Sequence, residues 1–243
     1  MQKTALFLAI AVFFTAVPAN AFSGRGGSAL NHELANRSGS ASVSSAAVSV
    51  FDAEAWSDAE LGGISSKVFS LALESAEAAV ARGDADPRTL TVIDFSRPST
   101  EPRLWVYDLR ERKLVLEEHV AHGRNSGADV PTRFSNEAES NMSSLGLYRT
   151  AEAYVGKHGY SLRLDGLEPG FNDHARERAI VIHGAEYVNA KAAKTQGRLG
   201  RSLGCPAVRP EVSRRLVDTI KEGGLVFAYY PDQEWLESSR YLN

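Results

Sequence analysis

One histidine and one cysteine carry the chemistry that this sequence offers. His183 ends an apolar run at residues 179–183 and is followed by Gly184, and Cys205, the single cysteine of the chain, lies in the segment RSLGCPAVR. A thiol becomes a nucleophile when a nearby base or a positive field stabilises its thiolate. The polar segment 189–200 leaves room for the chain to make an excursion and return. The two residues therefore predict a cysteine nucleophile with a histidine base.

The turn around Cys205 favours catalysis over a simpler alternative. A solitary cysteine often behaves as a small buried hydrophobe, and a histidine at a strand end is often a hydrogen-bonded core residue. Here Arg201 and Arg209 flank the turn, and their charges would favour a thiolate. Gly204 lets the backbone approach a substrate carbonyl closely, so the N–H groups of Gly204 and Cys205 are predicted to form an oxyanion hole. Ser202 is predicted to support the turn.

Short apolar runs separated by turn-rich or charged segments predict a sheet that positions this pair. The runs are residues 90–95, 103–109, 114–121, 146–151, 160–164, 179–183 and 224–230. The first three follow one another so closely that they predict a meander. Helical spacing is found at 58–82, where a capping-box pattern precedes it, and at 210–221, which begins with proline. The predicted fold class is mainly β, a sandwich or barrel with peripheral helices.

The N-terminal segments predict export. Residues 1–21 combine Lys3, an apolar run and small residues before a cleavage site, which is the pattern of a secretory signal peptide. The apolar run is too short to span a bilayer, so no stable membrane insertion is expected after cleavage. Residues 22–56 are rich in Ser, Ala and Gly and are predicted to be a flexible tether. A helix at 57–86 is then expected to pack on a catalytic domain of residues 87–243.

Composition limits the other functions of the chain. Without Lys3 the 27 Lys and Arg residues fall to 26 against 30 Asp and Glu, and a net charge of about −4 argues against a nucleic-acid partner. A single cysteine permits no internal disulfide. His119, His158 and His174 lack the spacing of a metal site and are expected to be structural or exposed. Neither a metal nor another cofactor is expected.

Three sequence elements resemble those of the L,D-transpeptidase (YkuD-type) catalytic domains of bacterial cell-wall enzymes. His183-Gly184 matches the strand-borne HG of that family, and Ser202-Leu203-Gly204-Cys205 matches its nucleophile turn of the form [ST]-H-G-C-x-[RN]. The segment 143–148 resembles the family's T-P-x-G-x-[FY] hairpin, and the three elements occur in the family's order. The resemblance covers about residues 90–230 and implies a YkuD-like fold. Leu203 and Ala207 depart from the motif, so the sequence resembles a divergent branch.

The resemblance implies a mechanism on peptidoglycan stem peptides in the periplasm or cell envelope. Cys205 would attack the carbonyl of the third stem residue, which is joined to D-Ala, and His183 would accept the thiol proton and later protonate the leaving amine. The backbone carbonyl of Gly184 would orient the histidine. Besides Ser202, residues expected to contact the substrate are Arg201, Arg209, His122 and Tyr148.

Two alternatives remain open from the sequence. With water as acceptor in place of a second stem peptide, the same chemistry would be that of an L,D-carboxypeptidase. The departures at Leu203 and Ala207 also fit a non-catalytic peptidoglycan-binding module with a decayed site. A papain-like protease is disfavoured because His183 precedes Cys205 and no C-G-x-C-W segment is present.

Overall fold

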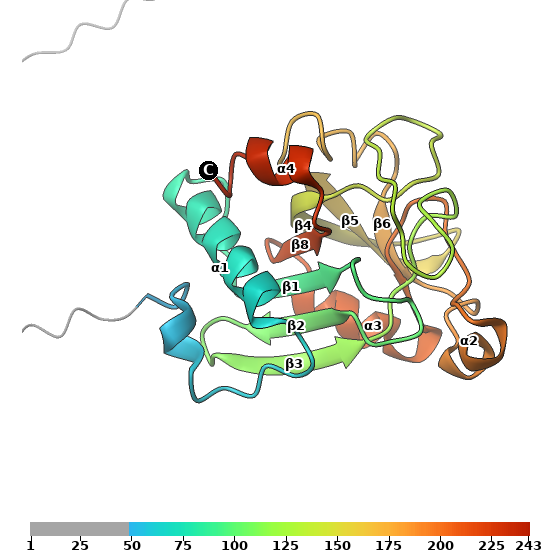
Figure 1. The fold of residues 1–243 in the computed structure, drawn as a ribbon, viewed down its shortest axis with the longest axis horizontal. Helices are drawn as coiled ribbons and strands as arrows, with labels where there is room; N and C mark the ends of the chain where they lie inside the picture. The colour runs from blue at the N-terminus through green and yellow to red at the C-terminus, as the bar shows by residue number, and fades with distance from the viewer. Residues whose placement is uncertain (1–48) are drawn as a thin grey trace, which may run out of the picture. The chain divides into compact units, whose positions relative to one another are not determined.

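A single sheet of eight strands forms the frame of the protein (Figure 1). The computed structural model describes residues 49–243, so the predicted signal peptide and most of the predicted tether lie outside the described residues. The strand order is β3-β2-β1-β8-β4-β5-β6-β7. The strands are β1 (Thr89–Asp94), β2 (Leu104–Asp108), β3 (Lys113–Glu118), β4 (Gly146–Gly156), β5 (Gly159–Gly166), β6 (Val181–Gly184), β7 (Ala207–Val208) and β8 (Leu225–Tyr229).

Long-range pairing closes the sheet towards a barrel. The predicted meander is confirmed, since β1–β2 and β2–β3 pair antiparallel. The C-terminal β8 then inserts between β1, to which it is parallel, and β4, to which it is antiparallel. At the far edge a bridge joins Ala121, just after β3, to Ala207 in β7. The predicted fold class is therefore confirmed as mostly β with an almost closed sheet and a few helices.

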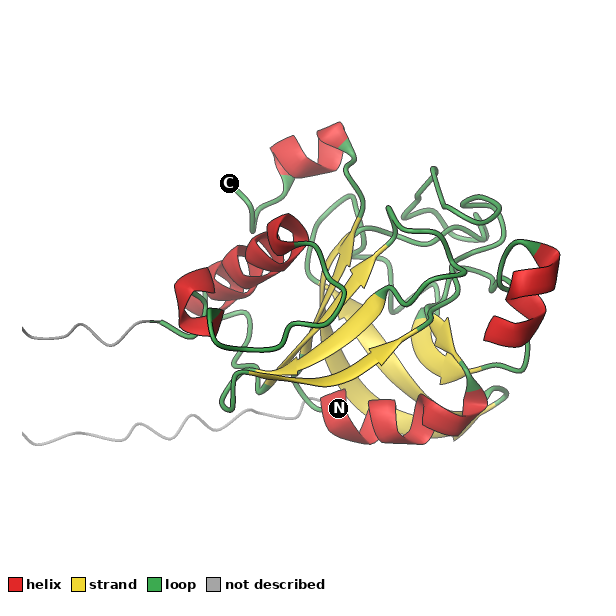
Figure 2. Cartoon of the chain, turned by 60° about the horizontal axis from the view of Figure 1, so that its bottom comes forward, coloured by secondary structure: helices red, strands yellow, loops and turns green. Residues whose placement is uncertain are grey.

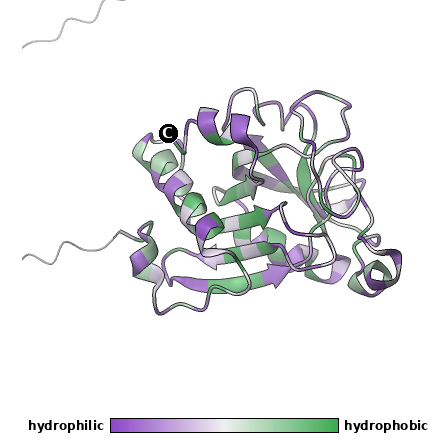
Figure 3. Cartoon of the chain, in the orientation of Figure 1, coloured by the Kyte–Doolittle hydropathy of each residue, from purple (hydrophilic) through white to green (hydrophobic). Residues whose placement is uncertain are grey.

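Two helices cover the central strands from opposite sides (Figure 2). The helix α1 (Ser66–Ala81) contacts β1 and β8, and α3 (Pro210–Ile220), which begins with Pro210 as predicted, contacts β1, β5 and β6. All six residues of β1 are buried as a result. Figure 3 shows the hydrophobic residues concentrated along the strands and on parts of the helices. The helices and strands share one hydrophobic core.

The N-terminal part of the described chain differs from the prediction. The helix starts at Ser66 rather than at residue 58, because Gly62 adopts a left-handed φ of 71° that a helix does not allow. Before it lies a 3-10 helix, η1 (Ala53–Trp56), in the segment expected to be tether. Trp56 is buried there, packs edge-on against Phe69 and donates from Nε1 to the carbonyl of Val50 at 2.7 Å. This indole anchors residues 50–56 on the domain.

Two short helices were not predicted. They are α2 (Ala190–Gln196), capped by Asn189, and α4 (Gln233–Ser238), capped by Asp232. The buried Trp235 of α4 donates to the carboxylate of Glu168, which fixes the C-terminal segment to the sheet. No helix among residues 49–243 is both long and apolar enough to cross a membrane.

Candidate active site

The strand β6 fixes His183 in one tautomer. Nδ1 of His183 lies 2.9 Å from the carbonyl oxygen of Gly184. Because a carbonyl can only accept, Nδ1 must carry the proton, and Nε2 is left as an unprotonated nitrogen. The side chain is 3% exposed, so few other orientations are open to it. His183 therefore offers a base at Nε2, in the manner predicted for it.

The strand β7 brings Cys205 beside the same strand. His183 pairs with Ala207 in parallel register, which sets Cys205 two residues earlier, next to Val181. The Cys205 sulfur accepts the N–H of Val181 at 3.5 Å and donates to the carbonyl of Ala179 at 3.7 Å. Ala179 has a left-handed φ of 54°, which directs the chain into β6. The predicted base thus lies on β6, and the predicted nucleophile lies in the turn just before the neighbouring β7.

Ser202 holds the turn that carries the cysteine. Its hydroxyl donates to the carbonyl of Cys205 at 2.6 Å and accepts the N–H of Gly204 at 3.1 Å. Gly204 has a φ of 127°, and a Cβ there would lie 2.9 Å from the carbonyl of Met142. The Gly204 N–H donates to Ser202 in this structure, and its oxyanion role stays a prediction. The N–H of Cys205 stays a candidate donor.

The segment before β4 forms a wall behind this turn. Ser143 donates from its hydroxyl to the carbonyl of Gly204 at 3.1 Å and accepts the N–H of Gly123 at 3.1 Å. Its own N–H donates to Ser126 at 2.9 Å. The backbone of His122 also accepts the N–H of Ser202. The predicted 143–148 motif and the loop 122–127 therefore both meet the cysteine turn, through backbone and serine contacts.

Burial keeps the candidate pair neutral at rest. Burial raises the pKa of the Cys205 thiol, although the N–H of Val181 and the charge of Arg178 oppose that rise. Burial lowers the pKa of His183, against the effect of the Gly184 carbonyl. Both shifts disfavour a thiolate–imidazolium pair. The directions of these two pKa shifts therefore favour transfer of the thiol proton during attack on a carbonyl over a thiolate formed beforehand.

Arg178 is the arginine that acts on the thiol, and sequence reasoning missed it. Its guanidinium donates to the carbonyls of Ser135 and Met142, each at 2.7 Å, and its charge lowers the pKa of Cys205. The predicted role of Arg201 and Arg209 in stabilising the thiolate is not supported. Arg209 forms a salt bridge with Glu118 at 2.6 Å, and Arg201 donates to the carbonyls of the 122–127 loop.

Two residues that are predicted to contact the substrate, His122 and Tyr148, are buried. His122 is 1% exposed, and Arg103 donates to its Nδ1 at 2.7 Å. Burial, followed by the charge of Arg103, lowers the pKa of His122 to about 3. Tyr148 is also buried and donates to the carbonyl of Ser144. Both side chains therefore support the wall of the site, and Tyr148 borders a small cavity of about 10 Å³ that Gly204 and Pro206 also line. The neighbour of the cysteine that does project outward is Leu203, which is 63% exposed.

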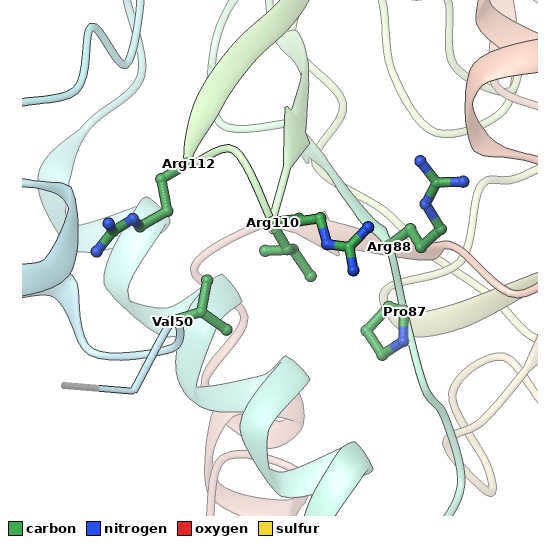
Figure 4. A pocket seen from close by; sticks show the side chains of 6 residues that line it. Val50, Pro87, Arg88, Arg110 and Arg112 are labelled. Carbon is green, nitrogen blue, oxygen red and sulfur yellow. The ribbon is translucent and has the colours of Figure 1, made fainter. Parts of the chain in front are cut away.

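A pocket elsewhere on the surface lacks a cysteine or histidine that could act as nucleophile or base. One of about 660 Å³ is lined by Val50, Pro87, Arg88, Leu109, Arg110 and Arg112 (Figure 4). None of these residues belongs to β6 or to the cysteine turn. Within residues 49–243 no group of three or more His, Cys, Asp or Glu side chains is arranged to hold a metal ion.

The fold is mostly β, and its neighbouring segments bring His183 and the cysteine turn side by side. Residues 60–229 match the family model described as the L,D-transpeptidase catalytic domain, and the chain belongs to that family. The resemblance predicted from the motifs is thereby confirmed. Among curated proteins, none matches the sequence.

Matches among solved structures include several proteins that are described as L,D-transpeptidases. An L,D-transpeptidase from Mycobacterium smegmatis is 11% identical over 59% of each chain, with a TM-score of 0.38. One from Xylanimonas cellulosilytica is 15% identical over 65% of this chain and 77% of that chain, with a TM-score of 0.35. One from Stackebrandtia nassauensis is 14% identical over 76% and 92%, with a TM-score of 0.33. This chain thus spans about three fifths of the M. smegmatis protein.

Proposed function

We propose that the protein is an exported cysteine-dependent acyltransferase that cross-links peptidoglycan stem peptides. Its membership of the L,D-transpeptidase catalytic domain family supports the reaction class. The observation that carries the proposal is the His183 tautomer, whose Nε2 is free to accept a proton on the strand that contacts the Cys205 sulfur. The signal-peptide pattern of residues 1–21 supports a location in the periplasm or cell envelope.

The proposed reaction has two acyl-transfer steps. The Cys205 sulfur attacks the carbonyl carbon of the third stem residue while its proton passes to Nε2 of His183. The C–N bond to D-Ala then breaks, and the departing amine takes the proton from His183. In the second step an amine of another stem attacks the thioester carbonyl and loses a proton to His183. The C–S bond then breaks, and the departing sulfur takes that proton and becomes the thiol again. The N–H of Cys205 is positioned in the same turn as the sulfur and is proposed to bind the oxyanion.

The recognition of the stem peptide is proposed to use residues other than those expected from the motif. Leu203 projects from the cysteine turn into solvent, and Tyr187 is also partly exposed near enough to Cys205 for the two to influence each other electrostatically. We propose that these two side chains contact the donor stem. Replacing Leu203 with Ala is then expected to raise the KM for the donor without a loss of folding stability, because the side chain is mostly exposed.

The decisive experiment is the incubation of purified protein with disaccharide-tetrapeptide, followed by mass spectrometry. Cross-linked dimers with released D-Ala are expected for the wild type and absent for Cys205→Ala, and thermal unfolding of the variant serves as the control for folding. Tripeptides without dimers would replace the transpeptidase with an L,D-carboxypeptidase. Undiminished products from Cys205→Ala would refute the cysteine mechanism. Failure of Cys205 to react with both a carbapenem and iodoacetamide would favour a non-catalytic wall-binding module.

A further inference from the structure

A second imidazole lies against the candidate base. The ring of His158 is stacked on the ring of His183, with centroids 4.5 Å apart and an angle of 29° between the planes. His158 was expected to be structural or exposed, and it is exposed, yet it covers one face of a nearly buried histidine. The two residues are far apart in the sequence, so the contact is a product of the fold.

The hairpin between β4 and β5 places His158 there. Gly156 pairs with Gly159, which leaves Lys157 and His158 as the two residues of the loop. Gly159 has a φ of 74°, a conformation that favours glycine and permits the tight reversal. Because Ser161 of β5 pairs directly with His183 of β6, the loop lies close to the end of β6 where the base is held.

We propose that His158 is a positioning residue that holds the plane of the His183 ring and keeps this ring in its neutral, base-competent form as the pH falls. The Gly184 carbonyl fixes one edge of the His183 ring, and the stack restrains its rotation about that hydrogen bond. A protonated His158 would repel a proton arriving at His183. The inference rests on the proposed function for its catalytic meaning, since it concerns the base of that reaction.

Among the charged groups around His183, His158 is the one whose charge affects the pKa of His183. The effects on the pKa of His183 are burial, the Gly184 carbonyl and the charge of His158, of which burial and His158 lower it. Several other charged groups near β6 have partners of their own. On α3, Asp218 accepts the hydroxyl of Tyr160 at 2.7 Å, and Arg214 lies over the Tyr160 ring. The cysteine turn contributes Cys205 itself, and Lys157 is the neighbour of His158 in the loop.

The test separates charge from packing with two substitutions. His158→Phe keeps an aromatic ring against His183 and removes the charge, whereas His158→Ala removes both. His174→Phe is the matched control, since His174 is also exposed and pairs with Asp173. The readout is the titration midpoint of the His183 imidazole, followed by NMR in labelled full-length protein, which needs no substrate.

We expect His158→Phe to raise the His183 midpoint by roughly 0.7 pH unit, the size of a repulsion between unit charges as far apart as the ring centroids, 4.5 Å, in a water-like dielectric. His158→Ala is expected to raise it further by exposing the ring, and His174→Phe to leave it in place. The acidic limb of the pH profile for acylation should move in parallel. An unchanged midpoint in His158→Phe would overturn the inference, even if the protein formed dimers. A raised midpoint in a protein without transpeptidase activity would uphold the contact and refute the proposed function instead.

Discussion

The hydroxyl of Ser202 gives a sharp test of how the cysteine turn is held. Ser202→Ala removes one donor and one acceptor at a residue that is 5% exposed. The carbonyl of Cys205 and the N–H of Gly204 would both lose their partner. An unsatisfied buried polar group costs about 1–3 kcal/mol, so we expect the free energy of unfolding to fall by about 3 kcal/mol. In a domain of this size that corresponds to roughly 6–12 °C in Tm.

The assay combines unfolding in urea with the rate of Cys205 alkylation by iodoacetamide. Ser202→Thr keeps the hydroxyl and should retain most of the stability. Ser213→Ala is the matched control, since that hydroxyl bonds only to the carbonyl of Pro210 in its own helix, and it should cost less than about 1 kcal/mol. If Ser202→Ala unfolds no more easily than Ser213→Ala, the account of the turn is refuted.

Two further predictions concern a strained residue and a buried histidine. Ala179→Gly should stabilise the protein by up to about 1 kcal/mol in urea unfolding, because the φ of 54° suits glycine better than alanine, and a loss of stability would contradict this reading. His122 is neutral in the fold with a pKa of about 3 but binds a proton in the unfolded chain below about pH 6.5. Stability should therefore fall as the pH is lowered from about 6.5 towards 3, by up to about 1.4 kcal/mol per pH unit. His122→Gln should flatten that dependence in unfolding measured at several pH values.

The regular elements could be predicted from the sequence because their signals are local. The strands were found to within a few residues, since each is a short apolar run bounded by turn residues. The helix α3 carries both a proline at its start and an amphipathic pattern. By contrast α2 and the two-residue β7 are too short for periodicity to reveal. The insertion of β8 between β1 and β4 depends on pairing between distant segments, which no local pattern encodes.

The site was predictable only where a motif marks it. His183 and Cys205 stood out by residue type, and the fold sets the turn that carries Cys205 beside the strand that carries His183. Tyr148 was expected at a groove, but β4 is buried on both faces at that point, so alternation along the strand gives no exposed side. The roles of Arg178 and His158 could not be predicted from the sequence, because they depend on contacts between distant segments. Arg178 borders the cysteine turn, and His158 stacks on His183. Arg201 and Arg209 are close to Cys205 in the sequence, but the arginine whose charge affects the pKa of the thiol is Arg178.

Arg178 offers the last and most direct test of the electrostatics of the thiol. A Cβ built on Gly204 would lie 3.5 Å from its Nη2, so the guanidinium borders the cysteine turn. A positive charge at such range lowers the pKa of a thiol by about one unit or more. Arg178→Met should therefore raise the midpoint of the pH–rate profile for iodoacetamide alkylation of Cys205 by about one pH unit.

The variant Arg178→Lys separates this charge from the structural role of the side chain. The guanidinium also binds Ser135, Ser140, Met142 and Ser144, so both variants should unfold more easily than the wild type. Lysine restores the charge but not that set of hydrogen bonds. If charge sets the reactivity of the thiol, Arg178→Lys will be destabilised yet will keep an alkylation midpoint near that of the wild type. Equal shifts in the two variants would mean that Arg178 acts on Cys205 only by holding residues 135–144 in place.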